Sequence, residues 1–371
     1  MKPPNPPGLA GTGSEGGINK AIVEKLIYTM KTDQIKNNTN NSPLGAGGIR
    51  AGIVGGAGYT GGEMVRLLIN HPSVSISFIH STSNAGNPVS KIHADLLGET
   101  DLVFTNTLQN DIDVLFLCVG HGDANKFLAA NKIADTVKII DLSQDFRLRA
   151  GSKMENRTFV YGLPELNKAA IQSAQNIANP GCFATAIQLG LLPLAKAGVL
   201  GDVYTTGITG STGAGQGLST TSHFSWRANN IQAYKSLQHQ HVNEIHQSLQ
   251  QLQGNDGTHV NFVPWRGDFT RGIYVSSIMD CGLPMEEIRQ LYKKYYSGHP
   301  FTYVSDTMID LKQVVNTNKC LLYIEKQGSK IVVHSAIDNL LKGACGQAVQ
   351  NMNLLFNIDE STGLKLKAAG F

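Results

Sequence analysis

A glycine-rich turn between an apolar strand and a helix is the feature that most limits how this 371-residue chain can fold. Residues 49–54 have the composition of a short buried strand, and the pattern predicts a helix over 63–70. Between them, Gly56, Gly58 and Gly61 match G-x-G-x-x-G. In this context the glycines permit a tight turn and let a pyrophosphate approach the backbone N–H groups at the helix start. The segment predicts dinucleotide binding, with an ordinary βα turn as the alternative.

Strand and helix segments alternate after this turn as far as residue 142. The pattern predicts strands at 75–80, 113–119 and 138–142 and a helix at 125–130. This alternation indicates an α/β fold with a parallel sheet and helices on both faces. After Pro180 a helix over 182–196 is followed by runs typical of a largely antiparallel sheet, at 202–209, 259–264, 272–280, 320–326 and 330–335. A last helix over 342–356 is expected to pack back on the first domain.

These patterns divide the chain into three parts. Residues 1–48 are rich in proline, glycine and asparagine and are interpreted as a flexible extension, with a partner-binding helix at 18–30 as the alternative. Residues 49–181 and 340–371 are predicted to form a Rossmann dinucleotide-binding domain. Residues 182–339 are predicted to form an α+β domain for substrate binding, catalysis and oligomerisation.

The overall composition excludes several classes of partner. Lys and Arg number 31 against 28 Asp and Glu, so the chain has no strong field for nucleic acid or an anionic membrane. No apolar run approaches the roughly 18 residues of a membrane span. Five cysteines without a CxxC pair favour a reduced, cytoplasmic setting over a disulfide scaffold or a zinc site. We therefore expect a cytoplasmic protein whose partner is a small molecule.

The residues after the second strand bear on the choice of dinucleotide. An NAD site usually has an acidic residue about 20 positions after the glycine turn, bonded to the ribose 2′-OH. No Asp or Glu lies between Glu63 and Asp95, whereas Ser81 and Ser83 follow the strand and Lys91 is near. Small hydroxyls and a lysine suit a 2′-phosphate, so NADP(H) is the predicted cofactor.

A turn of Asn179, Pro180 and Gly181 directly precedes Cys182 and an apolar helix. At a helix N-terminus the backbone N–H groups and the helix dipole stabilise a thiolate, and the same N–H groups can hold an oxyanion. Cys182 is therefore the candidate nucleophile. A buried structural cysteine is the alternative, and it is the favoured interpretation for Cys118, Cys281, Cys320 and Cys345.

Two histidines and a glutamate follow, at His239, His241 and Glu244. One histidine can act as general acid and base while a carboxylate orients its ring. A metal site made of these three side chains is the alternative, and one histidine is expected to be structural.

A second glycine cluster, at 207–217, follows a predicted strand. It contains Ser211 and Gly213 and is interpreted as a backbone cradle for an anion, with a flexible hairpin as the alternative. Four cations are candidates for binding an acidic substrate: Arg147, Arg227, Arg266 and Arg271.

Several motifs occur in a fixed order over residues 49–357. They are the glycine turn with Tyr-Thr-Gly, Ile-Asp-Leu-Ser-Gln-Asp-Phe-Arg at 140–147, Tyr-Gly-Leu-Pro-Glu-Leu at 161–166, Asn-Pro-Gly-Cys at 179–182, the cluster at 210–215, His-Gln-His at 239–241, Arg-Gly-Ile at 271–273 and Asp-Asn-Leu-Leu-Lys-Gly-Ala at 338–344. Together they resemble the N-acetyl-γ-glutamyl-phosphate reductases of arginine biosynthesis.

The resemblance implies a fold shared with aspartate-semialdehyde and glyceraldehyde-phosphate dehydrogenases. It also implies NADPH-dependent reduction of an N-acyl-γ-glutamyl phosphate through a thioester on Cys182, with His241 favoured over His239 as acid and base and Glu244 orienting it. Expected cofactor contacts are Gly55, Gly56, Ala57, Gly58, Tyr59, Thr60, Gly61, Ser81, Ser83 and Asn339. Expected substrate contacts are Arg147, Ser211, Gly213 and Arg271. No metal is expected, and family members are commonly homodimers or homotetramers.

The chain departs from the family pattern at three places. Gln240 stands where arginine is usual, Asn243 stands where proline is usual, and Asn84 or Asn87 replaces a basic residue after the second strand. The open alternatives are an N-succinyl instead of an N-acetyl substrate, an aspartate-semialdehyde dehydrogenase activity, a non-catalytic dinucleotide sensor and a metal-dependent hydrolase.

Overall fold

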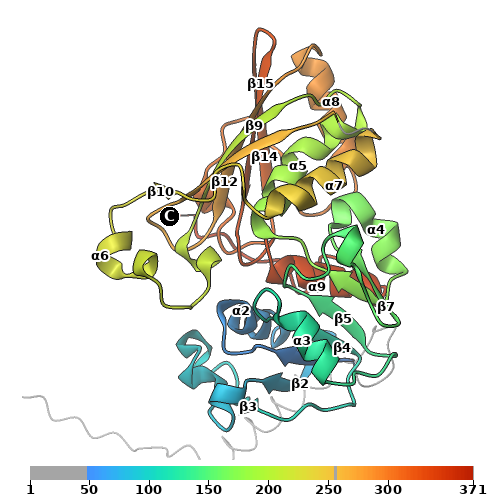
Figure 1. Cartoon of the computed structure of the whole chain (residues 1–371), viewed down its shortest axis with the longest axis vertical. Coiled ribbons are helices and arrows are strands. Elements are labelled where there is room, and N and C mark those ends of the chain that lie inside the picture. The colour runs from blue at the N-terminus through green and yellow to red at the C-terminus, as the bar shows by residue number, and fades with distance from the viewer. Residues whose placement is uncertain (1–47, 255–256, 371) are drawn as a thin grey trace, which may run out of the picture. The chain divides into compact units, whose positions relative to one another are not determined.

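The computed structural model describes residues 48–254 and 257–370. The expected flexible extension at 1–48 lies outside them apart from Gly48. From Ile49 onward the chain forms one unit around two β-sheets, which lie at the bottom and top of Figure 1.

The first sheet has the strand order β3-β2-β1-β4-β5-β8-β7-β6, and every neighbouring pair is parallel except β6 and β7. The three strands predicted after the first lie where expected, within one or two residues. The short β3, β6, β7 and β8 were not predicted. The strands are β1 (Ile49–Val54), β2 (Val74–His80), β3 (Phe104–Thr105), β4 (Val114–Leu117), β5 (Lys138–Asp141), β6 (Lys153–Met154), β7 (Arg157–Tyr161) and β8 (Asn176–Ala178).

Helices cover both faces of this sheet, as predicted. On one face α2 (Tyr59–Leu68) and α4 (Pro164–Gln172) both pack against α9 (Cys345–Leu355), so the last helix returns to the first domain. On the other face α3 (Asp123–Ala130) contributes Ala124 to a cluster with Leu115 and Leu117 of β4.

The helix α2 begins four residues before the predicted start at 63, because two glycines that look like turn residues belong to its first turn. A Cβ at Gly61 would lie 2.5 Å from the carbonyl oxygen of Gly55, and one at Gly62 would lie 2.4 Å from Nδ1 of His93. These glycines therefore let the helix start close against the preceding loop.

The second sheet has the order β10-β11-β9-β12-β15-β14-β13 and is largely antiparallel, as predicted, with β11–β9 and β13–β14 parallel. Its strands are β9 (Val203–Thr209), β10 (Gln232–Ala233), β11 (Val260–Arg266), β12 (Ile273–Asp280), β13 (Thr302–Val304), β14 (Cys320–Gln327) and β15 (Lys330–Ile337). The helices of this part are α5 (Cys182–Lys196), α6 (Phe224–Arg227), α7 (His241–Gln253) and α8 (Met285–Tyr296).

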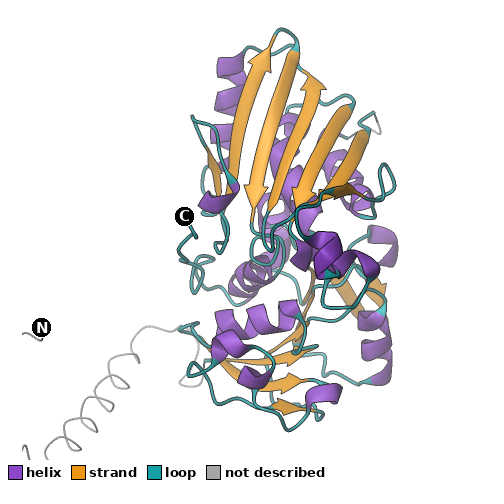
Figure 2. Ribbon diagram, turned by 90° about the vertical axis from the view of Figure 1, so that its left-hand side faces the viewer, coloured by secondary structure: helices purple, strands orange, loops and turns teal. Residues whose placement is uncertain are grey.

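The long helices of this part cover one face of the second sheet. The helix α5 packs on β12, β14 and β15, and α7 and α8 pack beside it. Side chains alternate along β12, so that Ile273 and Val275 are buried beneath the helices while Ile278 points to the opposite face. On that face, seen in Figure 2, the short helix η7 (Leu311–Gln313) and its neighbours pack against Tyr274 and Ala336. Elsewhere the face exposes Tyr204, Ile278 and Tyr303 by 60%, 42% and 47%.

Two further observations concern the described residues. None of their helices combines the length and apolarity needed to span a bilayer. All five cysteines are free thiols.

Candidate active site

A cavity of about 520 Å³ lies where the carboxyl ends of the first sheet's strands meet the start of α5 and the loops of the second sheet. Its walls come from residues within 58–60, 118–121, 179–183, 209–216, 234–241 and 339–344. Arg147, Lys235 and Arg266 also line it, and none of the described residues lining it is Asp or Glu. The walls are therefore positively charged and suit an anionic ligand.

The glycine turn presents its backbone to this cavity. Gly55 has φ of +80°, and a Cβ at Gly56 would lie 2.2 Å from Cγ2 of Ile79, so both positions require glycine. The N-cap residue of α2 is Gly58, which has no side chain, so the N–H groups of the first turn are suited to a phosphate. The cavity is lined by Gly58, Tyr59 and Thr60, while Gly55, Gly56, Ala57 and Gly61 lie behind them. This arrangement fits the pyrophosphate of a dinucleotide.

The residues expected at the ribose follow β2 and do not line the cavity itself. Ser83 is exposed and accepts a hydrogen bond from Nδ2 of Asn84 at 3.0 Å, whereas Ser81 is buried. Lys91 donates to Oδ1 of Asn87 at 2.8 Å. The end of the second strand is where dinucleotide folds bind the adenosine ribose, so exposed Ser83 is the more available of the two serines.

The helix α5 starts at Cys182, as predicted, and its N-terminus also lacks a side-chain cap. The Cys182 side chain is partly exposed to the cavity, whereas the other four cysteines are buried. Burial raises the pKa of the Cys182 thiol to about 11, although the N–H of Phe183 and the charge of Arg147 favour the thiolate. The sequence led us to expect a stabilised thiolate. Burial raises the pKa of Cys182 more than the N-terminus of α5 lowers it, so the side chain rests as the thiol.

This raised pKa predicts how Cys182 reacts with iodoacetamide. The alkylation rate of the ligand-free protein should rise about tenfold per pH unit from pH 7 to 9, because the thiolate fraction does so below the pKa. Peptide mass spectrometry of timed samples measures the rate at Cys182 alone. A rate that is already constant above pH 7 would show that the thiolate is the resting form.

The His241 imidazole lies against the turn that carries the nucleophile. A Cβ at Gly181 would be 2.3 Å from Nε2 of His241, and Nδ1 is buried without a hydrogen-bond partner among the described residues. Burial, helped by the charge of Arg147, holds the pKa of His241 well below 6.5, so the ring is neutral. His241 is therefore placed to exchange a proton at the nucleophile.

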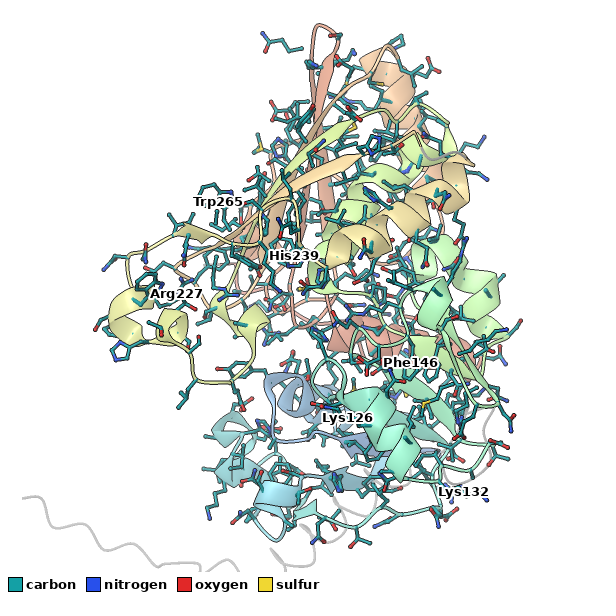
Figure 3. All side chains as sticks on the ribbon, viewed as in Figure 1. Lys126, Lys132, Phe146, Arg227, His239 and Trp265 are labelled. Atoms are coloured by element: carbon teal, nitrogen blue, oxygen red, sulfur yellow. The ribbon has the colours of Figure 1, made fainter. Side chains whose placement is uncertain are left out.

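The His239 ring, labelled in Figure 3, is packed among aromatic side chains. Its Nδ1 accepts the backbone N–H of His241 at 3.3 Å, and its ring packs edge-on against Phe183 and Phe262. Burial lowers its pKa to about 4. These contacts favour a packing role for His239, in line with the expectation that one of the two histidines is structural.

Glu244 supports the turn rather than the imidazole. One oxygen accepts Nη1 of Arg147 at 3.0 Å, and the other accepts the hydroxyl of Tyr161 at 2.9 Å and the backbone N–H of Gly181 at 3.0 Å. Nε2 of His241 lies 3.9 Å from the nearer oxygen. No metal-binding group of three His, Cys, Asp or Glu side chains occurs in the described part of the chain, so the alternative metal site has no support there.

Arg147, expected at the substrate, lines the cavity but is only 5% exposed. Besides Glu244 it binds the carbonyl oxygens of Asn179 and Leu142, each at 2.9 Å. With its donors used in this way, Arg147 holds the Asn179–Cys182 turn in place. Its expected direct contact with substrate stays a prediction.

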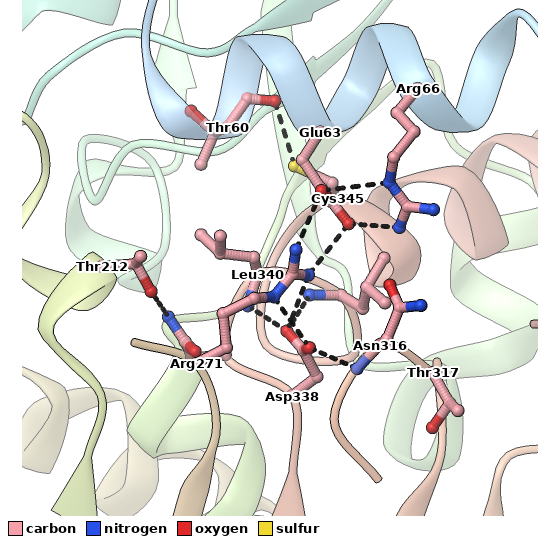
Figure 4. A network of polar contacts seen from close by, with 12 residues as sticks. Thr60, Glu63, Arg66, Thr212, Arg271, Asn316, Thr317, Asp338, Leu340 and Cys345 are labelled. Carbon is pink, nitrogen blue, oxygen red and sulfur yellow. Dashed lines mark hydrogen bonds and ion pairs between the residues drawn. The ribbon is translucent and has the colours of Figure 1, made fainter. Parts of the chain in front are cut away.

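Arg271 is also placed differently from the expectation, since it does not line the cavity. Figure 4 shows its guanidinium between two carboxylates: Nη2 is 2.9 Å from Glu63 of α2, and Nε is 3.0 Å from Asp338. Asp338 also accepts the backbone N–H groups of Asn316 and Leu340, at 2.7 and 2.8 Å. Arg271 thus ties the helix of the glycine turn to the loop that follows β15.

Replacing Arg271 by methionine should therefore affect stability. The change leaves the buried carboxylate of Asp338 without its cation, which costs on the order of 3 kcal/mol. Denaturant unfolding of the variant measures this loss. A variant as stable as the parent, with only a raised KM for substrate, would return Arg271 to the substrate site.

Of the remaining residues expected to contact a ligand, some line the cavity and one does not. Gly213 and Asn339 line the cavity, and Ser211 does not. The Asn339 side chain accepts the N–H of Gly272 at 2.7 Å and donates to Oγ1 of Thr212 at 3.0 Å. Asn339 therefore joins the second glycine cluster to the loop at 339–344.

Some residues at the site were missed by the sequence reasoning. His121 lines the cavity and accepts the N–H of Gln144 at 3.2 Å, and Tyr161 holds Glu244. Tyr234 and Lys235 also line the cavity. His121 could have been found from its place just after the predicted strand at 113–119, because ligands bind at the carboxyl ends of parallel strands. Tyr161 begins the Tyr-Gly-Leu-Pro-Glu-Leu motif at 161–166, but nothing in that motif indicates its contact with Glu244. Tyr234 and Lys235 stand in no recognisable motif.

Comparison with known proteins agrees with this arrangement. Residues 50–174 match the family model of the semialdehyde dehydrogenase NAD binding domain, and residues 182–339 match that of the semialdehyde dehydrogenase dimerisation domain. Solved structures with a similar fold include an aspartate semialdehyde dehydrogenase II from Vibrio cholerae (TM-score 0.65, 18% identity, 84% of this chain and 98% of that one). The enzyme from Candida albicans solved with NADP is another (TM-score 0.62, 15% identity, 84% and 99%).

Curated relatives are much more similar in sequence. Proteins named N-acetyl-γ-glutamyl-phosphate reductase from Phocaeicola vulgatus and Bacteroides thetaiotaomicron are each 56% identical over 87% of this chain and 100% of their own length. The protein of that name from Flavobacterium johnsoniae is 52% identical with the same coverage. The resemblance seen in the motifs is thereby confirmed, and the chain belongs to the N-acetyl-γ-glutamyl-phosphate reductase family of oxidoreductases, within the semialdehyde dehydrogenases.

Proposed function

We propose that this protein reduces an N-acyl-γ-glutamyl phosphate to the N-acylglutamate semialdehyde with NADPH, releasing phosphate, as a cytoplasmic step of arginine biosynthesis. One observation carries the proposal: a cavity in which none of the described lining residues is a carboxylate brings Cys182, His241 and the N-terminus of α2 together. The acyl phosphate and the dinucleotide are both anionic, so positive walls favour both. N-acetyl is the acyl group in the names of the relatives, and N-succinyl is the alternative.

The first step is formation of a thioester on Cys182. Binding of the anionic phosphate beside His241 favours the imidazolium, which allows the ring to take the thiol proton despite its lowered pKa. The sulfur attacks the acyl carbon, the bond from that carbon to the phosphate oxygen breaks, and the imidazolium returns its proton to the departing phosphate. The N–H groups at the start of α5 stabilise the oxyanion that forms during attack.

The second step reduces this thioester. Bound NADPH supplies the hydride. The carbon–sulfur bond then breaks, the aldehyde leaves, and Cys182 regains a proton through His241. A thiol suits this sequence because its thioester is electrophilic enough to be reduced. Arg147 and Glu244 hold the turn so that Cys182 and His241 keep their mutual positions.

The cofactor assignment rests on the glycine turn and on the residues after β2. We propose that residues 49–181 and 340–371 bind the dinucleotide, with Ser83 accepting the 2′-phosphate, and that 182–339 supply the substrate site. A protein of similar fold was solved with NADP, which supports the choice of NADP(H).

The exposed apolar part of the second sheet, on the face away from α5, supports a homodimer, or a homotetramer built from it. Tyr204 and Ile278 lie opposite each other on β9 and β12 and are both exposed there, in a segment that matches a dimerisation domain. Ile278→Glu should put a charge into that interface and yield monomers by light scattering. The matched surface variant Lys293→Glu on α8 should keep the assembly, and an unchanged mass for Ile278→Glu would exclude this face.

The activity is tested in the reverse direction. The protein is mixed with phosphate and each of N-acetylglutamate, N-succinylglutamate and aspartate semialdehyde, and NADP or NAD reduction is followed by absorbance. Turnover of an N-acylglutamate semialdehyde with NADP is expected, with the better substrate identifying the acyl group. Turnover of aspartate semialdehyde alone, or of none, would refute the proposal.

A further inference from the structure

The cavity has three cations in its wall, and they differ in whether a carboxylate already neutralises them. Arg147 is paired with Glu244, and Arg271 lies outside the cavity between Glu63 and Asp338. Lys235 and Arg266 have no ion pair with any of the described residues. These two are therefore the cations with charge left for a ligand.

Resting on the proposed function, we propose that Arg266 binds the carboxylate of the glutamyl substrate and that Lys235 binds its phosphate. The two residues determine substrate specificity and act on different parts of one molecule. This assignment replaces the expected contacts of Arg147 and Arg271.

Arg266 stands at the end of β11, where its guanidinium lies 4.8 Å from the ring centroid of Tyr234. The ring holds the guanidinium by a cation–π contact, and the guanidinium also donates a hydrogen bond to the Tyr234 hydroxyl. Nε of Arg266 is buried and has no hydrogen-bond partner among the described residues. A buried N–H without a partner is unfavourable, and the planar edge of arginine matches a carboxylate with two parallel hydrogen bonds. The unpartnered Nε of Arg266 thus suits a carboxylate oxygen.

Lys235 lies closer to the reacting groups. Its Nζ donates to Oε1 of Gln240 at 3.2 Å, and Gln240 stands between the two histidines. The Lys235 charge also helps to lower the pKa of both His239 and His241, as expected for a neighbouring cation. The phosphate is bonded to the carbon that Cys182 attacks, so it must lie beside these groups.

The backbone at Lys235 gives independent support. It has φ of +47°, a left-handed conformation that residues other than glycine rarely adopt. Such strain is typical of functional positions, where the surrounding structure holds a side chain in a required place. Here the strained residue is the one that carries the ammonium group into the cavity wall.

The reverse reaction separates the two roles, because semialdehyde and phosphate are then independent substrates. Arg266→Met should raise the KM for the semialdehyde about 10- to 100-fold and leave the KM for phosphate unchanged. Lys235→Met should raise the KM for phosphate by a similar factor and leave the KM for the semialdehyde unchanged. Arg266→Lys, which keeps the charge without the planar edge, should lie between Arg266→Met and the parent.

The controls are Arg289→Met and Lys293→Met on α8, where Arg289 is partly exposed and Lys293 is exposed; they remove the same charges away from the cavity. Both should leave the two KM values unchanged, and circular dichroism confirms that all variants fold. Unchanged KM values for Arg266→Met and Lys235→Met, or exchanged effects, would overturn the assignment while the proposed function stands. Absence of turnover by the parent protein would overturn both.

Discussion

Replacing Cys182 by serine is expected to lower kcat by at least about a thousandfold in both directions, because the hydroxyl is a far weaker nucleophile than the thiolate. The dinucleotide site does not use the thiol, so the Kd for NADPH should stay within about twofold of the parent value. Steady-state assays measure kcat, and a fluorescence titration with NADPH measures Kd separately.

Cys118→Ser is the matched control for this change. Cys118 also lines the cavity, but its thiol is buried and its pKa is raised to about 12 by that burial. The control should keep most of the activity. If Cys182→Ser kept more than a tenth of the parent kcat, the thioester mechanism would be wrong.

Adding a single methyl group at Gly181 should have the second large effect. The new Cβ would lie 2.3 Å from Nε2 of His241, so the imidazole must move away from the nucleophile. A displacement of about 1 Å in a catalytic group can cost about a hundredfold in rate, and a loss of that size in kcat is expected for Gly181→Ala.

Gly201→Ala serves as the comparison, because a Cβ at Gly201 meets nothing within 4 Å. It should leave kcat unchanged. Steady-state kinetics with thermal unfolding on both variants distinguishes a displaced ring from a damaged fold. A Gly181→Ala variant with parental kcat would mean that His241 is not the proton carrier.

The fold could be predicted well where the strands are long and apolar. The glycine turn, the parallel strands and the helix at 182–196 follow from local composition. The helix α7 was not predicted. Its sequence is rich in glutamine, and the apolar residues Ile245 and Leu249, four positions apart, are too few to show a clear helical pattern. Burial of those two residues against α5 comes from tertiary packing.

The sequence predicted which residues react, but it predicted less well the roles of the residues that position them. Cys182 and His241 stand in motifs, so their chemistry is visible in the sequence. The roles of Arg147 and Arg271 depend on the carboxylates beside them. Glu244 is 97 residues from Arg147 along the chain, and Asp338 is 67 residues from Arg271. Spacing along the chain carries no information about such pairs, and an arginine paired with a carboxylate looks the same in sequence as one that binds substrate.

The central claim, that Cys182 carries the acyl group, is tested most directly by trapping it. The protein is mixed with N-acetyl-γ-glutamyl phosphate without NADPH, quenched in acid, and analysed by intact-protein and peptide mass spectrometry. We expect a mass gain of one acyl group per chain, located on Cys182, removed by hydroxylamine and absent from Cys182→Ser. An active protein that forms no adduct on Cys182, or forms it on another residue, would contradict the claim.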